Sequence, residues 1–176
     1  MKKELIILLL LITILSFSCK KTNSGQTAKI DVTVITETDN FGTTLSQIDN
    51  SDWTNENTWT NEEFTLLQTP SVVQLGSSEK AIITVRPCFP NPTSGIIIFA
   101  ANISKPTLVQ IVIVDNMLSL KDRYFLANSN NNLNLFTFSL DASKYSNNTN
   151  YRIYYGFYSL ADGLYYKGHG DLKIAR

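Results

Sequence analysis

The sequence predicts an all-β protein, an antiparallel β-sandwich that follows an N-terminal export leader. The first observation is that short runs of alternating apolar and polar residues recur along the 176-residue chain, with turn-forming Asn, Asp, Gly and Pro between them. The second is that apolar residues do not recur at helical spacing over the length of a stable helix. Many short strands separated by turn signals are typical of sandwiches.

Residues 1–18 have the features of a cleaved export signal. Lys2 and Lys3 give a positive start, and an apolar run from Leu5 to Phe17 follows. Such a run has the length of a signal-peptide core and is shorter than the about 20 apolar residues of a membrane-spanning helix. Cys19 comes next, directly after a small residue, and this arrangement resembles a bacterial lipoprotein signal. We expect cleavage before Cys19 and lipid on its thiol; the alternative is an ordinary signal peptide with an incidental cysteine.

Lipid attachment determines the expected location. One acyl chain anchors only marginally, but a mature lipoprotein carries more than one, so the anchor is stable. Residues 19–28 contain the lipidated cysteine and a short polar tether. We expect a protein held at the outer membrane, with the membrane as its partner through the lipid. The absence of an acidic cluster after Lys20 and Lys21 favours the periplasmic face over the cell surface.

Residues 29–176 are expected to form the sandwich, and residues 29–86 supply its first strands and a polar loop. Alternation between Ile30 and Val34 predicts a half-buried strand. Residues 38–62 are long, polar and irregular. Three more short strands are expected, at Phe64–Leu67, Val72–Leu75 and Lys80–Val85.

Residues 87–176 have the clearer strand pattern. The strongest strand is Leu108–Val114, in which Val109, Ile111 and Ile113 form one apolar face. The other expected strands are Ile96–Phe99, Arg123–Leu126, Phe136–Leu140, Tyr151–Phe157, Leu164–Lys167 and Leu172–Ile174. Turns are expected at Asp115-Asn116, in the Asn-rich run 128–132 and, as a hairpin, at Ala161-Asp162-Gly163.

The run from Pro90 to Gly95 forms a rigid turn into a strand. After it come an apolar strand that ends in Asp115, a Leu140-Asp141 step and a Tyr-rich strand. Together these features resemble the C-terminal sorting domain of type IX secretion cargo, and the resemblance covers residues 87–176. It implies an Ig-like β-sandwich. The lipoprotein signal has a loose form, with Leu15 four residues before Cys19 and Ser16 in the usual leucine position. This form is likewise similar to those of Gram-negative bacteria that use type IX secretion.

Two departures bear on what the resemblance implies for function. The family has glycine after the aspartate turn and before the Tyr-rich strand, where this chain has Asn116 and Asn150. A lipid anchor would also be redundant for cargo that receives its own surface anchor. We therefore expect the sandwich fold without the sorting function, and we keep sorting as the alternative.

Composition narrows the function classes. The chain has 15 basic and 15 acidic residues and no basic stripe, which argues against nucleic-acid binding. It contains no Gly-rich phosphate loop, no Gly-x-Ser-x-Gly and no paired Cys-x-x-Cys. With Cys19 lipidated, Cys88 is unpaired, and we expect a buried apolar side chain there rather than a catalytic thiol. We expect no enzymatic activity, no cofactor and no metal site.

Trp53 and Trp59 are the candidate ligand-binding residues. They lie in a polar stretch rich in Asn and Thr. Exposed aromatic rings in such a loop are suited to stacking on a glycan or binding an envelope protein. The alternative is that both indoles fold back to cover a small core.

Other polar and aromatic groups have alternative interpretations. His169, flanked by two glycines and followed by Asp171, could contribute to a metal site, but a strand-end bulge or turn is the expected structure. The pairs Asp49/Asp52 and Glu62-Glu63 could be glycosidase carboxylates, but we expect them to be solvated. The C-terminal tyrosines occupy both strand faces; one face must be core, and the other could bind a partner or a second sheet.

The sequence thus predicts a non-enzymatic envelope lipoprotein with a binding or assembly module, with a type IX secretion cargo or accessory protein as the alternative.

Overall fold

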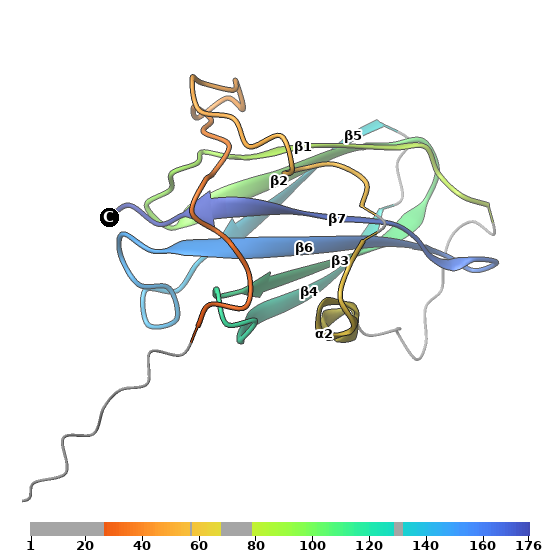
Figure 1. The fold of residues 1–176 in the computed structure, drawn as a ribbon. Coiled ribbons are helices and arrows are strands. Elements are labelled where there is room, and N and C mark those ends of the chain that lie inside the picture. Colours follow the sequence, from red (N-terminus) through yellow and green to blue (C-terminus); the bar gives the residue numbers. More distant parts are fainter. Residues whose placement is uncertain (1–26, 57, 68–78, 129–131) are drawn as a thin grey trace, which may run out of the picture.

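The computed structural model describes residues 27–56, 58–67, 79–128 and 132–176. The strands of these residues form two antiparallel sheets that pack face to face (Figure 1). One sheet has the order β1-β2-β5, with β1 (Ile83–Phe89), β2 (Ile96–Ile103) and β5 (Asn132–Ser139). The other has the order β4-β3-β6-β7, with β4 (Leu120–Asn128), β3 (Thr107–Val114), β6 (Asn150–Ser159) and β7 (Gly163–Lys173). The predicted all-β sandwich is confirmed.

The core lies between the inner faces of the two sheets. Alternate residues of β3 and β6 point into it, as the period of a strand requires. These side chains are fully buried and pack against Ile97 and Phe99 of β2; they are Val109, Ile111, Ile113, Ile153, Tyr155 and Phe157. The apolar face predicted for β3 is therefore correct.

The outer face of the four-stranded sheet is also covered, by described residues between 27 and 67. Figure 1 shows residues 27–56, in orange, crossing in front of β6 and β7. The helix α2 (Asn61–Leu66) lies nearby, and Trp59 and Leu67 pack on Val112, Val114 and Tyr154. This cover explains why all residues of β3 are buried and not only the alternate ones.

Two predicted N-terminal strands are not strands. Residues 30–34 run without a ladder, because the Asp31 carboxylate accepts from the Thr33 backbone and hydroxyl, and the Val32 carbonyl accepts from the Asn150 side chain. Residues 64–66 belong to α2 instead. The Thr60 hydroxyl caps the backbone of Glu63, and the Glu63 carboxylate caps the backbone of Thr60, a capping box that starts a helix. The expected strand at Val72–Leu75 lies outside the described residues.

The turns and strands of the C-terminal part agree better with prediction. The run from Pro90 to Gly95 connects β1 to β2, and the buried Asn91 amide in it donates to the carbonyls of Thr36 and Asp171. The hairpin at residues 161–163 joins β6 to β7, and Gly163 has φ +66° there. The two short strands expected after this hairpin are one strand, β7. Leu172 lies within it, whereas Ile174 forms only an isolated bridge with Thr93.

Cys88 is buried in β1, as expected, and it has no disulfide partner among the described residues. Burial raises the pKa of its thiol, which keeps the group protonated and unreactive. Cys19 and the leader lie outside the described residues. Within the described part of the chain, no helix has the length and apolar character needed to cross a bilayer.

Candidate functional site

The candidate site forms where residues 49–56 run beside β7, the edge strand of the four-stranded sheet. The backbone N–H of Trp53 donates to the His169 carbonyl at 2.6 Å, and that of Glu56 donates to the Lys167 carbonyl at 2.8 Å. The backbone N–H of Asp171 donates to Asp52 Oδ2 at 3.2 Å. The segment therefore satisfies polar groups that an edge strand otherwise presents to solvent.

The glycines around His169 make this close approach possible. A Cβ at Gly168 would lie 2.0 Å from the carbonyl oxygen of Thr54, and one at Gly170 would lie 2.2 Å from Cε2 of Trp53. The pairing of β7 with β6 is regular at both positions. The expectation of a strand-end bulge or turn was wrong, since glycine is needed here for close packing and not for a bend.

Trp53 and Trp59 lie in the interior, with exposed fractions of 7% and 8%. Trp53 enters the core and stacks on Tyr155 with ring centroids 6.2 Å apart. Trp59 packs edge-on against Tyr154 on the outer face of the sheet, with centroids 5.1 Å apart. The two indoles hold the segment in place and do not present open rings to solvent.

The other candidate groups are also redistributed. Glu62 is exposed and pairs with Lys29, but Glu63 is buried and accepts a hydrogen bond from the Tyr154 hydroxyl at 2.7 Å. The outward-facing tyrosines of β6 are buried, so they form no open binding face. Asp52 is only 5% exposed, which overturns the expectation that it is solvated.

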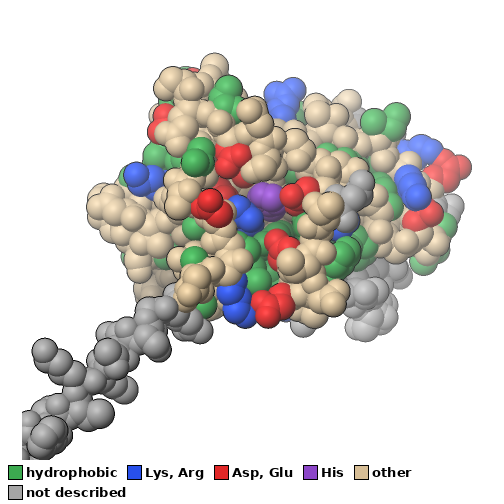
Figure 2. All heavy atoms as spheres, viewed as in Figure 1, with side chains coloured by type: hydrophobic (Ala, Val, Ile, Leu, Met, Phe, Trp, Pro, Cys, Tyr) green, Lys and Arg blue, Asp and Glu red, His purple; other side chains and the backbone are tan. Residues whose placement is uncertain are grey.

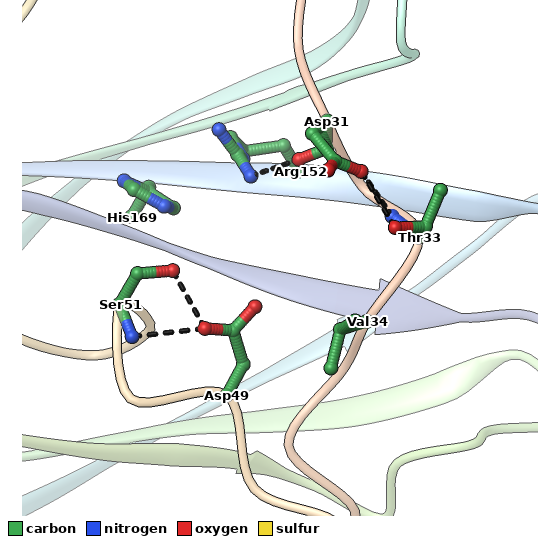
Figure 3. Close-up of a pocket in the computed structure, with 7 residues that line it drawn as sticks. All are labelled: Asp31, Thr33, Val34, Asp49, Ser51, Arg152 and His169. Carbon is green, nitrogen blue, oxygen red and sulfur yellow. Dashed lines mark hydrogen bonds between the residues drawn. The ribbon is translucent and has the colours of Figure 1, made fainter.

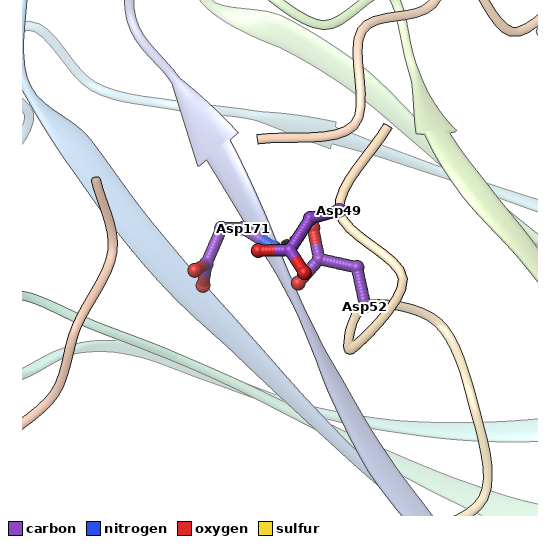
Figure 4. Close-up of side chains that lie close together, drawn as sticks. All are labelled: Asp49, Asp52 and Asp171. Atoms are coloured by element: carbon purple, nitrogen blue, oxygen red, sulfur yellow. Dashed lines mark hydrogen bonds between the residues drawn. The ribbon is translucent and has the colours of Figure 1, made fainter. Parts of the chain in front are cut away.

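Carboxylates gather on the outer face of β6 and β7. Asp49 and Asp52 belong to the segment 49–56 that runs beside β7, and Asp171 projects from β7 itself (Figure 4). Each offers an oxygen atom, and these three oxygens lie within 4.8 Å of one another. Burial, together with the charge of Asp171, raises the pKa of Asp52 to about 7. Burial also raises the pKa of Asp171, although an ion pair with Arg152 opposes the change.

Arg152 and Asp171 form a bidentate ion pair. The Arg152 Nε donates to Asp171 Oδ1 at 2.7 Å, and its terminal nitrogen donates to Oδ2 at 2.8 Å. By contrast, no lysine or arginine of the described residues pairs with Asp49 or Asp52. Asp52 Oδ1 is buried and has no hydrogen-bond partner among those residues. Negative charge is therefore left uncompensated at this place.

His169 lies between this uncompensated charge and a second carboxylate. Its Nδ1 lies 2.6 Å from Glu56 Oε2, and the same oxygen accepts from Trp59 Nε1 at 2.6 Å. Although burial opposes it, these hydrogen bonds lower the pKa of Glu56. An ionised carboxylate accepts only, so Nδ1 carries the proton. The other ring nitrogen, Nε2, lies 4.0 Å from Asp52 Oδ1.

A polar hollow of about 260 Å³ opens above these groups (Figure 3). Its lining residues are Asp31, Thr33, Val34, Asp49, Ser51, Arg152 and His169. Figure 2 shows the purple imidazole of His169 on this face of the molecule, with acidic side chains, in red, around it. We call this hollow, together with the buried Asp52 and Asp171 beside it, the acidic pocket.

The sequence suggests the pair Asp49/Asp52 and, separately, His169 with Asp171, but it does not bring the two pairs together. Arg152 and Glu56 were missed entirely. The available signal was the Gly-His-Gly-Asp run, in which two glycines in one strand indicate close approach of another segment. No protein-family model matches the chain, and neither curated proteins nor solved structures gave a match.

Proposed function

We propose that the protein is a non-enzymatic, lipid-anchored protein of the outer membrane whose β-sandwich is a binding module, and that the acidic pocket takes a positively charged ligand. The observation that carries this is the pairing pattern of the pocket. Arg152 neutralises Asp171, while Asp49 and Asp52 have no lysine or arginine partner among the described residues. A buried charge is costly unless an opposite charge or a metal compensates it.

The chemistry of the pocket supports recognition of a cation. Carboxylates surround a polar hollow that is open to solvent at Asp31 and partly at Asp49. A cation that enters this hollow gains electrostatic attraction strengthened by the low dielectric around Asp52. An anion or a neutral glycan would leave the same charge uncompensated. A basic segment of an envelope protein, or a small cation, is therefore the ligand class that fits.

A thermal-shift panel tests this function. The mature chain, residues 19–176 with Cys19→Ala, is heated with divalent ions, a polyamine or a lysine-rich peptide, and in parallel with sulfate or glucuronate. We expect only positively charged ligands to raise the melting temperature, because a ligand that binds the folded state stabilises it. Asp49→Asn should reduce the rise. A shift with the anions, or none with any cation, would contradict the proposal.

The membrane anchor is tested separately in cells. Cys19→Ala should move the protein from the membrane fraction to the soluble envelope fraction, because the lipid is the proposed anchor. Ser18→Ala is the matched control, since it leaves the thiol in place and keeps a small residue before it. If the Cys19→Ala protein still sediments with membranes, another element anchors the chain.

Sorting by type IX secretion is the second candidate function. One observation favours it: within the described residues, every strand of the sandwich lies between Ile83 and Lys173, nearly the part that resembles the sorting domain. The test is a secreted reporter fused to residues 27–176, a fusion that retains the residues covering the outer face of the sheet. Delivery of this fusion to the surface of a type IX-competent host would favour sorting, and retention of the folded reporter in the periplasm would argue against it.

A further inference from the structure

We propose that the acidic pocket binds one divalent metal ion through carboxylate oxygens of Asp49 and Asp52 and through Nε2 of His169. The inference rests on the proposed function, because it identifies the cation that the pocket takes. Asp49 and Asp52 come from residues 49–56, and His169 comes from β7, which is hydrogen-bonded to that segment. The ion would therefore link residues 49–56 to the sheet.

Asp52 Oδ1 and His169 Nε2 are the donor pair that the proposed ion would bridge. Asp52 Oδ1 and His169 Nε2 lie 4.0 Å apart, which is too far for a hydrogen bond between them. A metal ion lies about 2.0–2.2 Å from a nitrogen or carboxylate ligand, so in a tetrahedral site these two atoms would approach to about 3.4 Å around it. Asp49, Asp52 and Asp171 each offer an oxygen within 4.8 Å of the other two, so the Asp49 carboxylate would have to move toward Asp52 and His169 to share the ion.

The buried oxygen of Asp52 is an independent indication of a ligand. Its side chain is fully enclosed, yet Oδ1 has no hydrogen-bond partner among the described residues. Buried polar atoms are nearly always paired, so an unpaired one needs an explanation, and a bound cation would supply one here. In Figure 4 the Asp52 carboxylate is directed into the space beside Asp49 and Asp171.

The surroundings of His169 give a third indication. Glu56 holds the Nδ1 proton, and the Trp59 indole holds Glu56 in place through the same carboxylate oxygen. The other ring nitrogen, Nε2, lies 4.0 Å from Asp52 Oδ1. Metal-binding histidines almost always donate their other ring N–H to a carboxylate, carbonyl or water, which orients the ring and raises its basicity.

The donor set indicates which ion to expect. Asp171 is occupied by Arg152 on both oxygens, so it is a neighbour of the ion and not a principal ligand. Two carboxylates and one imidazole suit Zn²⁺ or a similar transition metal, whereas Ca²⁺ needs about six to eight oxygen ligands. The polar hollow beside Asp49 and His169 would supply water as a further ligand. We therefore expect Zn²⁺ to bind more tightly than Ca²⁺.

Calorimetric titration of the metal-free mature chain, untagged and with Cys19→Ala, tests the site with Zn²⁺ and Ca²⁺ as probes. We expect one Zn²⁺ per chain and at least about tenfold weaker binding of Ca²⁺. Glu56→Gln should weaken Zn²⁺ binding about 10–100-fold, as loss of a supporting carboxylate does. Asp52→Asn and His169→Gln should weaken it by at least about the same factor. Asp31→Asn, in the same hollow but outside the ligand set, is the matched control and should bind like the wild type.

A spectroscopic measurement avoids dependence on variants that fold poorly. His169 is the only histidine, so its ring nitrogens give unambiguous NMR signals. Zn²⁺ should shift the Nε2 signal strongly and leave Nδ1 protonated. Zn²⁺ binding that survives both His169→Gln and Asp52→Asn, an unchanged Nε2 signal, or no Zn²⁺ binding at all would overturn the inference. If Zn²⁺ fails while a polyamine or basic peptide still binds through Asp49, the proposed function stands and only the metal site falls.

Discussion

Asp52→Asn should make the metal-free protein more stable above neutral pH, because it removes a buried charge that lacks a cationic partner. Burial and repulsion from Asp171 raise the pKa of Asp52 from 3.8 to about 7 in the folded protein. One pKa unit corresponds to about 1.4 kcal/mol. The ionised carboxylate therefore lowers the free energy of unfolding by as much as about 4 kcal/mol.

The pH range of this effect follows from the two pKa values. Below about pH 4, Asp52 is protonated in the folded and the unfolded chain, so its charge has no effect. Between about pH 4 and 7 the unfolded chain releases the proton and the folded chain keeps it, so stability falls as pH rises. The advantage of the Asn variant over the wild type should grow from nearly zero at about pH 4 to as much as about 4 kcal/mol at about pH 8.

Urea unfolding in the presence of a chelator measures this difference, with the fluorescence of the buried Trp53 and Trp59 as the signal. Asp162→Asn is the control. Its carboxylate is exposed, and hydrogen bonds from Ser159 and Lys80 lower its pKa, so removing it should give no gain at high pH. If Asp52→Asn is less stable than the wild type at pH 8, the fold compensates the Asp52 charge and the reasoning is wrong.

Two other substitutions test the contacts around the pocket. Gly170→Ala should lower the free energy of unfolding by about 1–3 kcal/mol and change the Trp53 emission, because its Cβ would overlap the indole. Gly163→Ala is the control, since its Cβ would meet nothing within 4 Å, and it should leave the emission unchanged. Equal emission spectra for both variants would contradict the close packing of Gly170 on Trp53. Arg152→Met should cost about 3–5 kcal/mol in urea unfolding by leaving Asp171 unpaired. The double variant Arg152→Met/Asp171→Leu should recover most of that loss, and a double variant as unstable as the single one would show that the ion pair is not the cause.

The C-terminal strands could be predicted because their signal is local. Val109, Ile111 and Ile113 alternate with residues on the other face, and this period of two needs no knowledge of distant contacts. β7 was divided into two strands because Gly168 and Gly170 have low strand propensity. Their reason for being there, the passage of Thr54 and Trp53 over the strand, depends on a segment more than a hundred residues earlier in the chain.

The N-terminal part was harder to predict for two different physical reasons. The helix α2 has a readable local signal, the capping box of Thr60 and Glu63, and the apolar run Phe64–Leu67 hid it. The stretch Ile30–Val34 has the alternation of a strand, but no strand of the described residues pairs with it to complete a ladder. Alternation reports burial on one side only, and hydrogen-bond partners decide whether a strand forms.

The acidic pocket could not be predicted because its parts meet only in the folded chain. Asp52 and Asp171 are 119 positions apart, and Glu56 and His169 are 113 apart. In the sequence, Asp52 has the more ordinary interpretation of a solvated carboxylate and His169 that of a histidine at a bend, and Glu56 gives no signal at all. These residues meet because β7 lies at an edge of its sheet, where residues 49–56 can run beside it. Which strand lies at an edge depends on the topology of the whole fold.

Asp52 has two roles, and they oppose each other. Its Oδ2 accepts from the edge of β7, and the adjacent Trp53 enters the core, so the residue is part of the contact that seals the sandwich. The same contact buries its charge, which destabilises the fold unless something neutralises it. A proton does so at low pH, and a cation in the acidic pocket would do so at neutral pH. Arg152 and Asp171 neutralise each other and need no ligand. The contrast between these two neighbouring carboxylates is therefore the physical reason to regard the pocket as a binding site and not only as a structural charge cluster.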